Sequence, residues 1–366
     1  MNFSAVVGQQ AMKDKLLTSV HSGRVPHAQL FLGGSGSGNL ALALAYAGYL
    51  LCRNPTENDR CGQCDACRKV DSLTHPDLHF TFPFPSTTGD TCTDVYPQWR
   101  KALIRNPYLD YATWMAELAS ENKQGNIPVK ECHAILKNLS LKAYDGNYKI
   151  LLLWLPEFLG NEGNILLKLL EEPPEKTLFL LVCNNQDRLL STIISRTQII
   201  RIPPVDEEAI AAHLTSREGA SNEEAARIAM MSGGDLVKAL ELLQNTENPY
   251  LDAFRNWMGY CYKRNMHMAA KWSDEFSGSG REHIKGFLRY GLEIIRAITV
   301  MEYLGERNGL SEKEKEFVSK LGSLLSPVKM VRIYDWFNDA AYEIERNGNA
   351  KMIFTELSFK IAKLFM

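Results

Sequence analysis

The chain has 366 residues, of which 45% are hydrophobic and 23% are charged, and its formal net charge is −2. This length suits two or three globular domains. The near-neutral charge argues against a protein that holds nucleic acid tightly by itself, because neutralising phosphates usually requires a basic excess. No apolar stretch of about 18 residues occurs, and the first residues lack the basic and then apolar pattern of a secretory leader. We therefore expect a cytoplasmic protein with no membrane partner.

The N-terminal part predicts a strand that runs into a glycine-rich turn and then a helix. Residues 11–22 have a helical pattern, residues 28–34 form the short apolar run AQLFLGG, and residues 40–52 are rich in alanine and leucine. A strand, a glycine turn and a helix in this order can cradle a nucleotide phosphate.

This glycine turn departs from a working P-loop, G-x-x-x-x-G-K-[ST], in which a lysine contacts the phosphates and a hydroxyl contacts Mg²⁺. Gly33 and Gly38 keep the two glycines, but Asn39 stands in place of the lysine and Leu40 in place of the hydroxyl residue. No lysine occurs between residues 15 and 69, so a shift of register does not restore the motif. We expect no ATP binding. The turn either binds another anion at the helix N-terminus or, as we favour, is purely structural.

Four of the eight cysteines are clustered. Cys52, Cys61, Cys64 and Cys67 form a C-x8-C-x2-C-x2-C array, and four thiolates complete the closed tetrahedral shell of a structural zinc ion. Two alternatives stay open, an iron–sulfur cluster and reduced cysteines without metal, although the long first gap fits neither common ferredoxin spacing. Since no coordination position remains for a catalytic water, we expect the zinc to be architectural.

Further along the chain, apolar strands alternate with helices. Residues 148–155, 177–183 and 197–204 are predicted strands, and residues 160–172 are a predicted helix that a double proline ends. Continuous apolar strands are typical of parallel sheets covered on both faces. The pattern predicts a doubly wound α/β domain over residues 1–204.

After residue 204 only helical patterns occur. Residues 205–247 contain three short helix patterns and predict a small helical domain. Residues 248–366 contain longer amphipathic stretches, whose aromatic and methionine stripes we interpret as the core of an all-α domain.

Several segments together resemble a known family. They are VVGQQAMKDKL, the four-cysteine array, NILLKLLEEPPEKTLFLLVCNN, LLSTIISRTQIIRIPP and GGDLVKAL. They are similar to the delta-prime type of small subunit of the bacterial DNA polymerase III clamp loader, within the AAA+ superfamily. The resemblance extends to about residue 245, while the C-terminal third matches only in being helical.

The resemblance implies an AAA+ (RecA-like) α/β domain carrying the zinc module at 52–67, a helical lid domain at 205–247 and a helical collar, or oligomerisation, domain at 248–366. Members of the family assemble into a ring with gamma or tau subunits and delta. The ring opens the sliding clamp and places it on primed DNA.

The resemblance also locates catalytic positions. Counting from the LEEPP segment, Trp154 and Leu155 stand where the family has its magnesium-holding aspartate and its catalytic glutamate. Asn184, Asn185 and Lys238 stand near sensor positions, and we expect them to have no such function here. With lysine, hydroxyl and both carboxylates absent, we expect no ATPase activity from this chain.

One catalytic residue of the family is present. Arg196, in the segment ISRT, matches an S-R-C motif whose arginine acts in trans on the nucleotide of a neighbouring subunit, as an arginine finger. The alternative is an ordinary salt-bridged arginine between a helix and a strand.

Residues 80–126 are an insertion relative to the family, rich in proline and aromatic residues. We expect a partly helical flap around residues 108–120. It either covers its own domain, which we favour, or binds a partner.

The sequence thus predicts a non-hydrolysing subunit of the clamp loader, a component of the DNA polymerase III holoenzyme that supplies Arg196 to a neighbouring ATPase. The first alternative is an active gamma- or tau-type AAA+ ATPase. A zinc-bearing adaptor that binds DNA by itself is a third, more remote possibility, because no basic stripe is present.

Overall fold

The computed structural model describes residues 1–120, 123–140, 142–144, 148–244, 250–304, 310 and 312–365. The chain divides into two compact units, Met1–Leu240 and Glu241–Met366. The predicted boundary between the second and third domains, at residues 247 and 248, lies outside the described residues. The predicted boundary at residue 204 remains a prediction.

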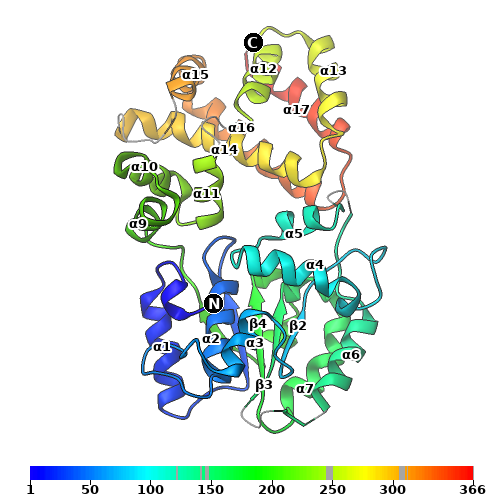
Figure 1. Ribbon diagram of the computed structural model, residues 1–366. Coiled ribbons are helices and arrows are strands. Elements are labelled where there is room, and N and C mark those ends of the chain that lie inside the picture. The colour runs from blue at the N-terminus through cyan, green and yellow to red at the C-terminus, as the bar shows by residue number, and fades with distance from the viewer. Residues whose placement is uncertain are drawn as a thin grey trace. The chain divides into compact units, whose positions relative to one another are not determined.

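The first unit is built on a parallel sheet with the strand order β2-β3-β4-β1-β5. Figure 1 labels three of these strands, β2, β3 and β4. The strands are β1 (Ala28–Leu32), β2 (Leu78–Thr81), β3 (Lys149–Trp154), β4 (Thr177–Cys183) and β5 (Gln198–Arg201). Every residue of β3 and β4 is buried, as expected for inner strands of a sheet covered on both faces. The predicted parallel α/β sheet is confirmed.

Strand β2 was not predicted, because the sequence indicates no strand between the apolar runs at residues 28–34 and 148–155. It has only four residues, pairs with β3 alone and includes the polar residues His79 and Thr81, so it lacks the long apolar run of an inner strand. Strand β5 ends earlier than predicted, before Pro203 and Pro204, because proline has no N–H to donate to a ladder.

Helices cover both faces of this sheet. Helix α2 (Asn39–Leu51), which is buried along its whole length, packs against β1, β3 and β4. On the other face, strand residues such as Leu30, Leu151 and Phe179 form a core with α6 (Val129–Ser140) and α7 (Leu167–Glu171). Alternate side chains of a strand point to opposite faces, so the sheet supplies both cores. The predicted helix at 160–172 is in fact the 3-10 helix η3 (Gly160–Leu166) followed by α7, because its first half contains two glycines.

The remaining elements of the α/β part are short or lie at its edges. They are η1 (Phe3–Ala5), α1 (Gln10–His21), α3 (Asp65–Asp71), η2 (Pro156–Phe158), η4 (Gln186–Arg188) and α8 (Ser191–Ile194).

Residues 80–126, called the aromatic insertion below, contain two helices, α4 (Cys92–Arg105) and α5 (Tyr111–Glu117). Helix α5 lies within the predicted flap, whereas α4 was not predicted, because Pro97 within it is a helix-breaking signal. In Figure 1, α4 lies across the end of the strands. Trp99 and Trp114 are fully buried within the first unit, so the insertion covers its own unit, as favoured from the sequence.

Three helices follow β5, as predicted: α9 (Glu207–Glu218), α10 (Asn222–Ser232) and α11 (Leu236–Gln244). The hydroxyl of Ser221 accepts a hydrogen bond from the backbone N–H of Glu224, which caps α10.

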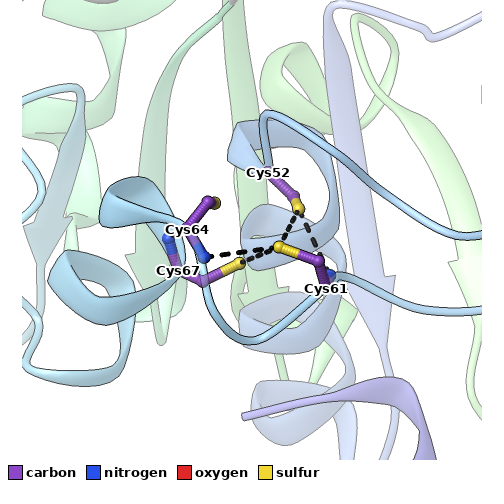
Figure 2. Close-up of side chains that lie close together, drawn as sticks. All are labelled: Cys52, Cys61, Cys64 and Cys67. Carbon is purple, nitrogen blue, oxygen red and sulfur yellow. Dashed lines mark hydrogen bonds between the residues drawn. The ribbon is translucent and has the colours of Figure 1, made fainter.

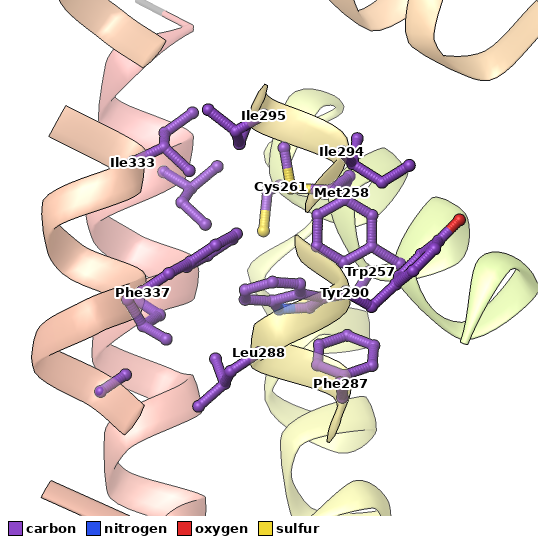
Figure 3. Packing of buried hydrophobic residues seen from close by; sticks show 14 of the residues in the cluster. Trp257, Met258, Cys261, Phe287, Leu288, Tyr290, Ile294, Ile295, Ile333 and Phe337 are labelled. Carbon is purple, nitrogen blue, oxygen red and sulfur yellow. The ribbon is translucent and has the colours of Figure 1, made fainter. Parts of the chain in front are cut away.

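Besides residues 241–244, which end α11, the described residues of the second unit form six helices and no strand. They are α12 (Leu251–Tyr262), α13 (Met266–Phe276), α14 (Arg281–Leu304), α15 (Glu312–Gly322), α16 (Pro327–Glu345) and α17 (Ala350–Leu364). The core is aromatic, and Phe254, Trp257, Phe287, Phe337 and Phe354 are each 0% exposed. Figure 3 shows Trp257, Phe287 and Phe337 of this core. This confirms the prediction that the aromatic stripes form a helical core. Among the described helices, none is both long enough and apolar enough to cross a membrane.

Candidate functional site

The glycine turn connects β1 to α2 at the carboxyl end of the sheet. Gly36 and Gly38 have φ angles of +69° and +84°, which L-residues with a side chain rarely adopt. Helix α2 begins at the next residue, Asn39. The predicted order of strand, glycine turn and helix is therefore confirmed.

Asn39 points into the protein and ties the turn to the end of β4. Its Nδ2 lies 2.9 Å from the carbonyl oxygen of Gly33 and 3.0 Å from Oδ1 of Asn184, and its Oδ1 accepts the backbone N–H of Leu40 at 2.8 Å. The side chain thus uses its donors and acceptor within the protein, and it engages one backbone N–H at the start of α2. The sequence shows that the lysine is absent at this position, but it does not show that Asn39 bonds other groups of the protein.

A small hollow remains beside the turn. It is lined by residues 35, 36 and 38–41, by residues 107–109 of the aromatic insertion, and by Trp154 and Asn184 at the ends of β3 and β4. The structure therefore brings Gly38, Asn39, Leu40 and Trp154 together. Gly33 and Leu155 are not among the lining residues, and Leu155 is 2% exposed.

Glu157 lies next to this hollow. Its Oε1 accepts the backbone N–H groups of Asn184 at 2.8 Å and Asn185 at 3.2 Å, whereas Oε2 is buried without a hydrogen-bond partner. Burial raises the pKa of the Glu157 carboxyl, although the two backbone donors partly oppose this effect.

The glycine turn also contacts the helices that follow β5. The carbonyl oxygen of Gly36 accepts the backbone N–H of Leu236 at 3.1 Å, and a Cβ on Gly36 would lie 1.7 Å from Oδ1 of Asp235. On the other side, Nε2 of Gln9 donates to the carbonyl oxygens of Ser37 at 2.9 Å and Pro203 at 2.6 Å. These contacts join segments far apart in the chain, so no local pattern in the sequence could have revealed them.

The four clustered cysteines converge (Figure 2). Their sulfur atoms all lie within 4.8 Å of one another, with 3.5 Å between Cys52 and Cys61 and 3.9 Å between Cys61 and Cys67. Four sulfurs bound at about 2.3 Å in a tetrahedron are roughly 3.8 Å apart. The array predicted from spacing could therefore hold one metal ion.

The local backbone explains this convergence. Cys52 directly follows α2, and Cys64 caps α3 by accepting the backbone N–H of Cys67 at 3.4 Å. The backbone N–H groups of Gln63 and Cys64 lower the pKa of Cys61 to about 6, which favours the thiolate that metals bind. The donor set of four sulfurs fits zinc chemically.

Arg196 lies between α8 and β5, away from the hollow. Its Nε donates to Oε1 of Glu171 at 2.6 Å, its Nη2 also contacts that carboxylate, and its Nη1 donates to the carbonyl oxygen of Thr192 at 2.9 Å. The arginine side chain is 31% exposed. The ion pair anticipated in the alternative interpretation is thus present, and the guanidinium remains partly open to solvent.

The strand order, the glycine turn after β1 and the helices after β5 agree with the AAA+ α/β domain that the sequence predicts. Residues 8–206 match the family described as DNA polymerase III, delta subunit. The chain belongs to this family of DNA polymerase III clamp-loader subunits, and the predicted resemblance to the delta-prime type is confirmed.

Individual relatives agree with this assignment. DNA polymerase III subunit delta′ of Escherichia coli K12 is 29% identical over 235 residues, which cover 63% of this chain and 58% of that protein. Subunit gamma of Buchnera aphidicola is 26% identical over 252 residues, covering 67% of this chain and 59% of that protein. The chain thus matches less than two thirds of the length of these relatives. Because they include both delta′ and gamma subunits, similarity alone does not distinguish the two types.

Solved structures give weaker likenesses. A clamp loader delta protein of Bacillus subtilis has a TM-score of 0.33 at 11% identity, covering 96% of this chain and 100% of that one. A gamma subunit-related protein of Thermotoga maritima has a TM-score of 0.40 at 15% identity, covering 97% and 99%. Such TM-scores do not establish a shared fold, so the family assignment rests on the sequence matches.

Proposed function

We propose that this chain is a non-hydrolysing subunit of the DNA polymerase III clamp loader, which supplies Arg196 to the ATP site of a neighbouring subunit. The observation that carries the proposal is the set of side chains around the hollow. Asn39 turns inward, Leu40 offers no hydroxyl, and Trp154 offers no carboxylate. Phosphoryl transfer needs charge on the phosphates, a held metal ion and a positioned water, and these side chains provide none of them.

Arg196 has the chemistry for a role in trans. A planar guanidinium can bind two oxygens of a phosphate at once, and it stabilises the charge that develops during phosphoryl transfer. Its partner Glu171 is 48% exposed, so their ion pair contributes little and can be exchanged for a phosphate.

The proposed partners are sister subunits of the gamma or tau type and delta, and through them the sliding clamp and primed DNA. Helix α16 supports an association of this kind. Val328, Val331, Tyr334 and Tyr342 are 66%, 61%, 47% and 59% exposed. At 100° per residue they lie within about 120° of one another, on the side of α16 opposite its buried residues Ile333, Phe337, Ala340 and Ile344. We call these four exposed residues the outer stripe of α16. The same arc also carries Asp335, Asn338 and Glu345, so this side of the helix mixes polar with exposed apolar residues, as protein–protein contact surfaces do.

For the cysteine cluster we propose a structural zinc ion held by Cys52, Cys61, Cys64 and Cys67. It would fix the segment between α2 and α3 without taking part in catalysis, since four protein ligands close the shell.

The test is an ATPase assay of the purified chain alone and of a complex reconstituted with gamma or tau and delta. The isolated chain is expected to show no hydrolysis above background, while the complex hydrolyses ATP. Turnover by the isolated chain that requires Mg²⁺ and disappears in Gly38→Asp would instead favour the alternative, an active gamma- or tau-type ATPase. Failure to assemble with these subunits would contradict the proposal as a whole.

A further inference from the structure

The aromatic insertion reaches the glycine turn through Tyr108. A Cβ on Gly38 would lie 3.1 Å from Cε1 of this ring, and Tyr108 is only 9% exposed. Its hydroxyl accepts the backbone N–H of Val7 at 2.7 Å, and burial raises the pKa of Tyr108 to about 12, so the hydroxyl stays protonated. One ring therefore contacts both the turn and the N-terminal segment.

A second group of rings covers the end of β3. Trp99 lies 5.0 Å from Trp154 between ring centroids, stacks on Phe82 at 4.1 Å and meets Trp114 edge-on at 5.2 Å. Trp154 is 1% exposed and the other three are 0% exposed. Trp154 occupies the position where the family resemblance puts a metal-holding carboxylate, so an apolar cluster stands where an ATPase would be polar.

The insertion is fixed firmly in this place. The carboxylate of Glu131, on α6, accepts the hydroxyl of Thr81 and the backbone N–H of Cys92, both at 2.8 Å, and so joins the end of β2 to the start of α4. The two ends of the insertion also pair with each other, because Phe84 near its start and Asn126 at its end exchange two backbone hydrogen bonds of 3.0 and 3.1 Å. Both ends are therefore attached to the sheet or to each other.

Little room is left beside the turn. The remaining hollow measures about 10 Å³, which is roughly the room that one water molecule needs. A nucleotide would have to displace Tyr108 to lie against Gly38.

We propose that the aromatic insertion is a built-in occupant of the former nucleotide site: Tyr108 and the cluster around Trp99 fill it and hold the turn, the N-terminal segment and the end of β3 together. A bound ligand stabilises a fold by a free energy that rises with the logarithm of the ligand concentration and vanishes when the ligand is absent. An occupant on the same chain does so at all concentrations, because its local concentration is fixed by covalent connection. The proposal rests on the proposed function, since it takes the turn as the remnant of a nucleotide site.

The experiment uses the isolated full chain and needs neither assembly nor clamp loading, so its outcome is independent of the assays described above. Hydrogen exchange is measured over residues 5–9 and 35–42 in the parent, in Tyr108→Ala and in Tyr108→Phe. Tyr144→Ala is the matched control, because Tyr144 is 72% exposed in the same unit. Thermal unfolding of the parent is followed with and without millimolar Mg-ATP.

We expect the amides of both segments to exchange faster when the ring of Tyr108 is removed. Tyr108→Ala should speed exchange in both segments by on the order of 10²-fold, because it removes a buried ring that both contact. Tyr108→Phe keeps the ring and loses one hydrogen bond, so exchange should rise roughly fivefold, and at Val7 more than in the turn. The control should match the parent, and Mg-ATP should leave the parent's melting temperature unchanged.

Three results would overturn the proposal. They are a rise of the parent's melting temperature with Mg-ATP, exchange in Tyr108→Ala equal to that of the control, and exchange of the Val7 amide in the parent as fast as in an unstructured peptide. The last measurement decides the question even if Tyr108→Ala fails to fold.

Discussion

Arg196, which lies between α8 and β5, forms an ion pair with Glu171 at the end of α7, with Nε and Oε1 2.6 Å apart. The pair and a hydrogen bond from Nη1 to the carbonyl oxygen of Thr192 hold the guanidinium at the surface in a defined orientation. A surface pair of this kind contributes about 0–1 kcal/mol, so a more highly charged phosphate can replace the carboxylate.

Arg196→Ala should leave folding and assembly intact but lower ATP hydrolysis by the reconstituted complex. An arginine finger contributes roughly 10³–10⁵ in rate at its own site, whereas the other sites of the ring keep their own fingers, so the total rate falls partially. Arg196→Lys should not restore the rate, because an ammonium lacks the planar fork. Arg255→Ala, another exposed and ion-paired arginine, is the control. Parent-like hydrolysis by the Arg196→Ala complex would remove the catalytic role.

Glu171→Gln separates the two interpretations of Arg196. If the ion pair itself matters, this variant should behave like Arg196→Ala, because both break the same pair. If the arginine acts in trans, Glu171→Gln should retain ATPase activity within about twofold, since the guanidinium is still present and is less strongly held. The measurement is the ATPase rate of the two complexes side by side, and equal losses in both would support a purely structural pair.

The purified chain should contain one zinc ion, measured by elemental analysis. Cys64→Ser combined with Cys67→Ser should abolish stoichiometric metal and loosen the segment between α2 and α3, because two remaining thiolates cannot close the shell. Cys132→Ala, a buried cysteine outside the cluster, should retain the zinc. Iron in place of zinc would favour the iron–sulfur alternative, and no metal at all would favour simple reduced thiols.

Glu157 should make stability depend on pH. Its folded-state pKa is raised above the ordinary 4.5 by burial, so the folded protein keeps a proton that the unfolded chain releases. The free energy of unfolding should therefore fall as pH rises from about 4.5 through the folded-state pKa of Glu157. Above that pKa, Glu157 should add no further pH dependence. Glu157→Gln should remove the contribution and be more stable than the parent at pH 7. Urea unfolding across this range tests it, with the exposed Glu175→Gln as control; a parent-to-variant difference that does not change with pH would contradict it.

The outer stripe of α16 should be needed for assembly. Val331→Glu puts a charge on a surface that is 61% exposed in the isolated chain, so the chain should fold normally but bind its sister subunits more weakly, by roughly tenfold or more. Leu324→Glu, at a residue 41% exposed outside α16, is the matched control. Size-exclusion chromatography and binding titrations measure the effect, and equal affinity of both variants would mean that this stripe lies outside the interface.

Features encoded locally were predictable from the sequence. The apolar runs of β3 and β4 predicted inner parallel strands, and the spacing of four cysteines predicted their convergence. Strand β2 and helix α4 were missed for local reasons as well, because β2 is a short edge strand with polar residues and α4 contains Pro97.

The environment of the glycine turn could not be predicted in the same way. The turn's neighbours are Gln9, Tyr108 and Leu236, which come from three distant parts of the chain. Sequence reasoning identified which chemical groups are absent at the turn, but only tertiary packing shows which groups have taken the space.

Gly36 shows that a glycine of such a motif can be needed for packing within the chain. Any side chain at this position would collide with Asp235 and Leu236, whether or not the turn binds a ligand. A glycine signature can therefore outlast its ligand, because protein-to-protein packing inside one chain sets the same steric demand as a phosphate. The spacing of glycines indicates only that two stretches of backbone approach each other closely. The side chains that follow the glycines indicate whether the turn can bind a nucleotide.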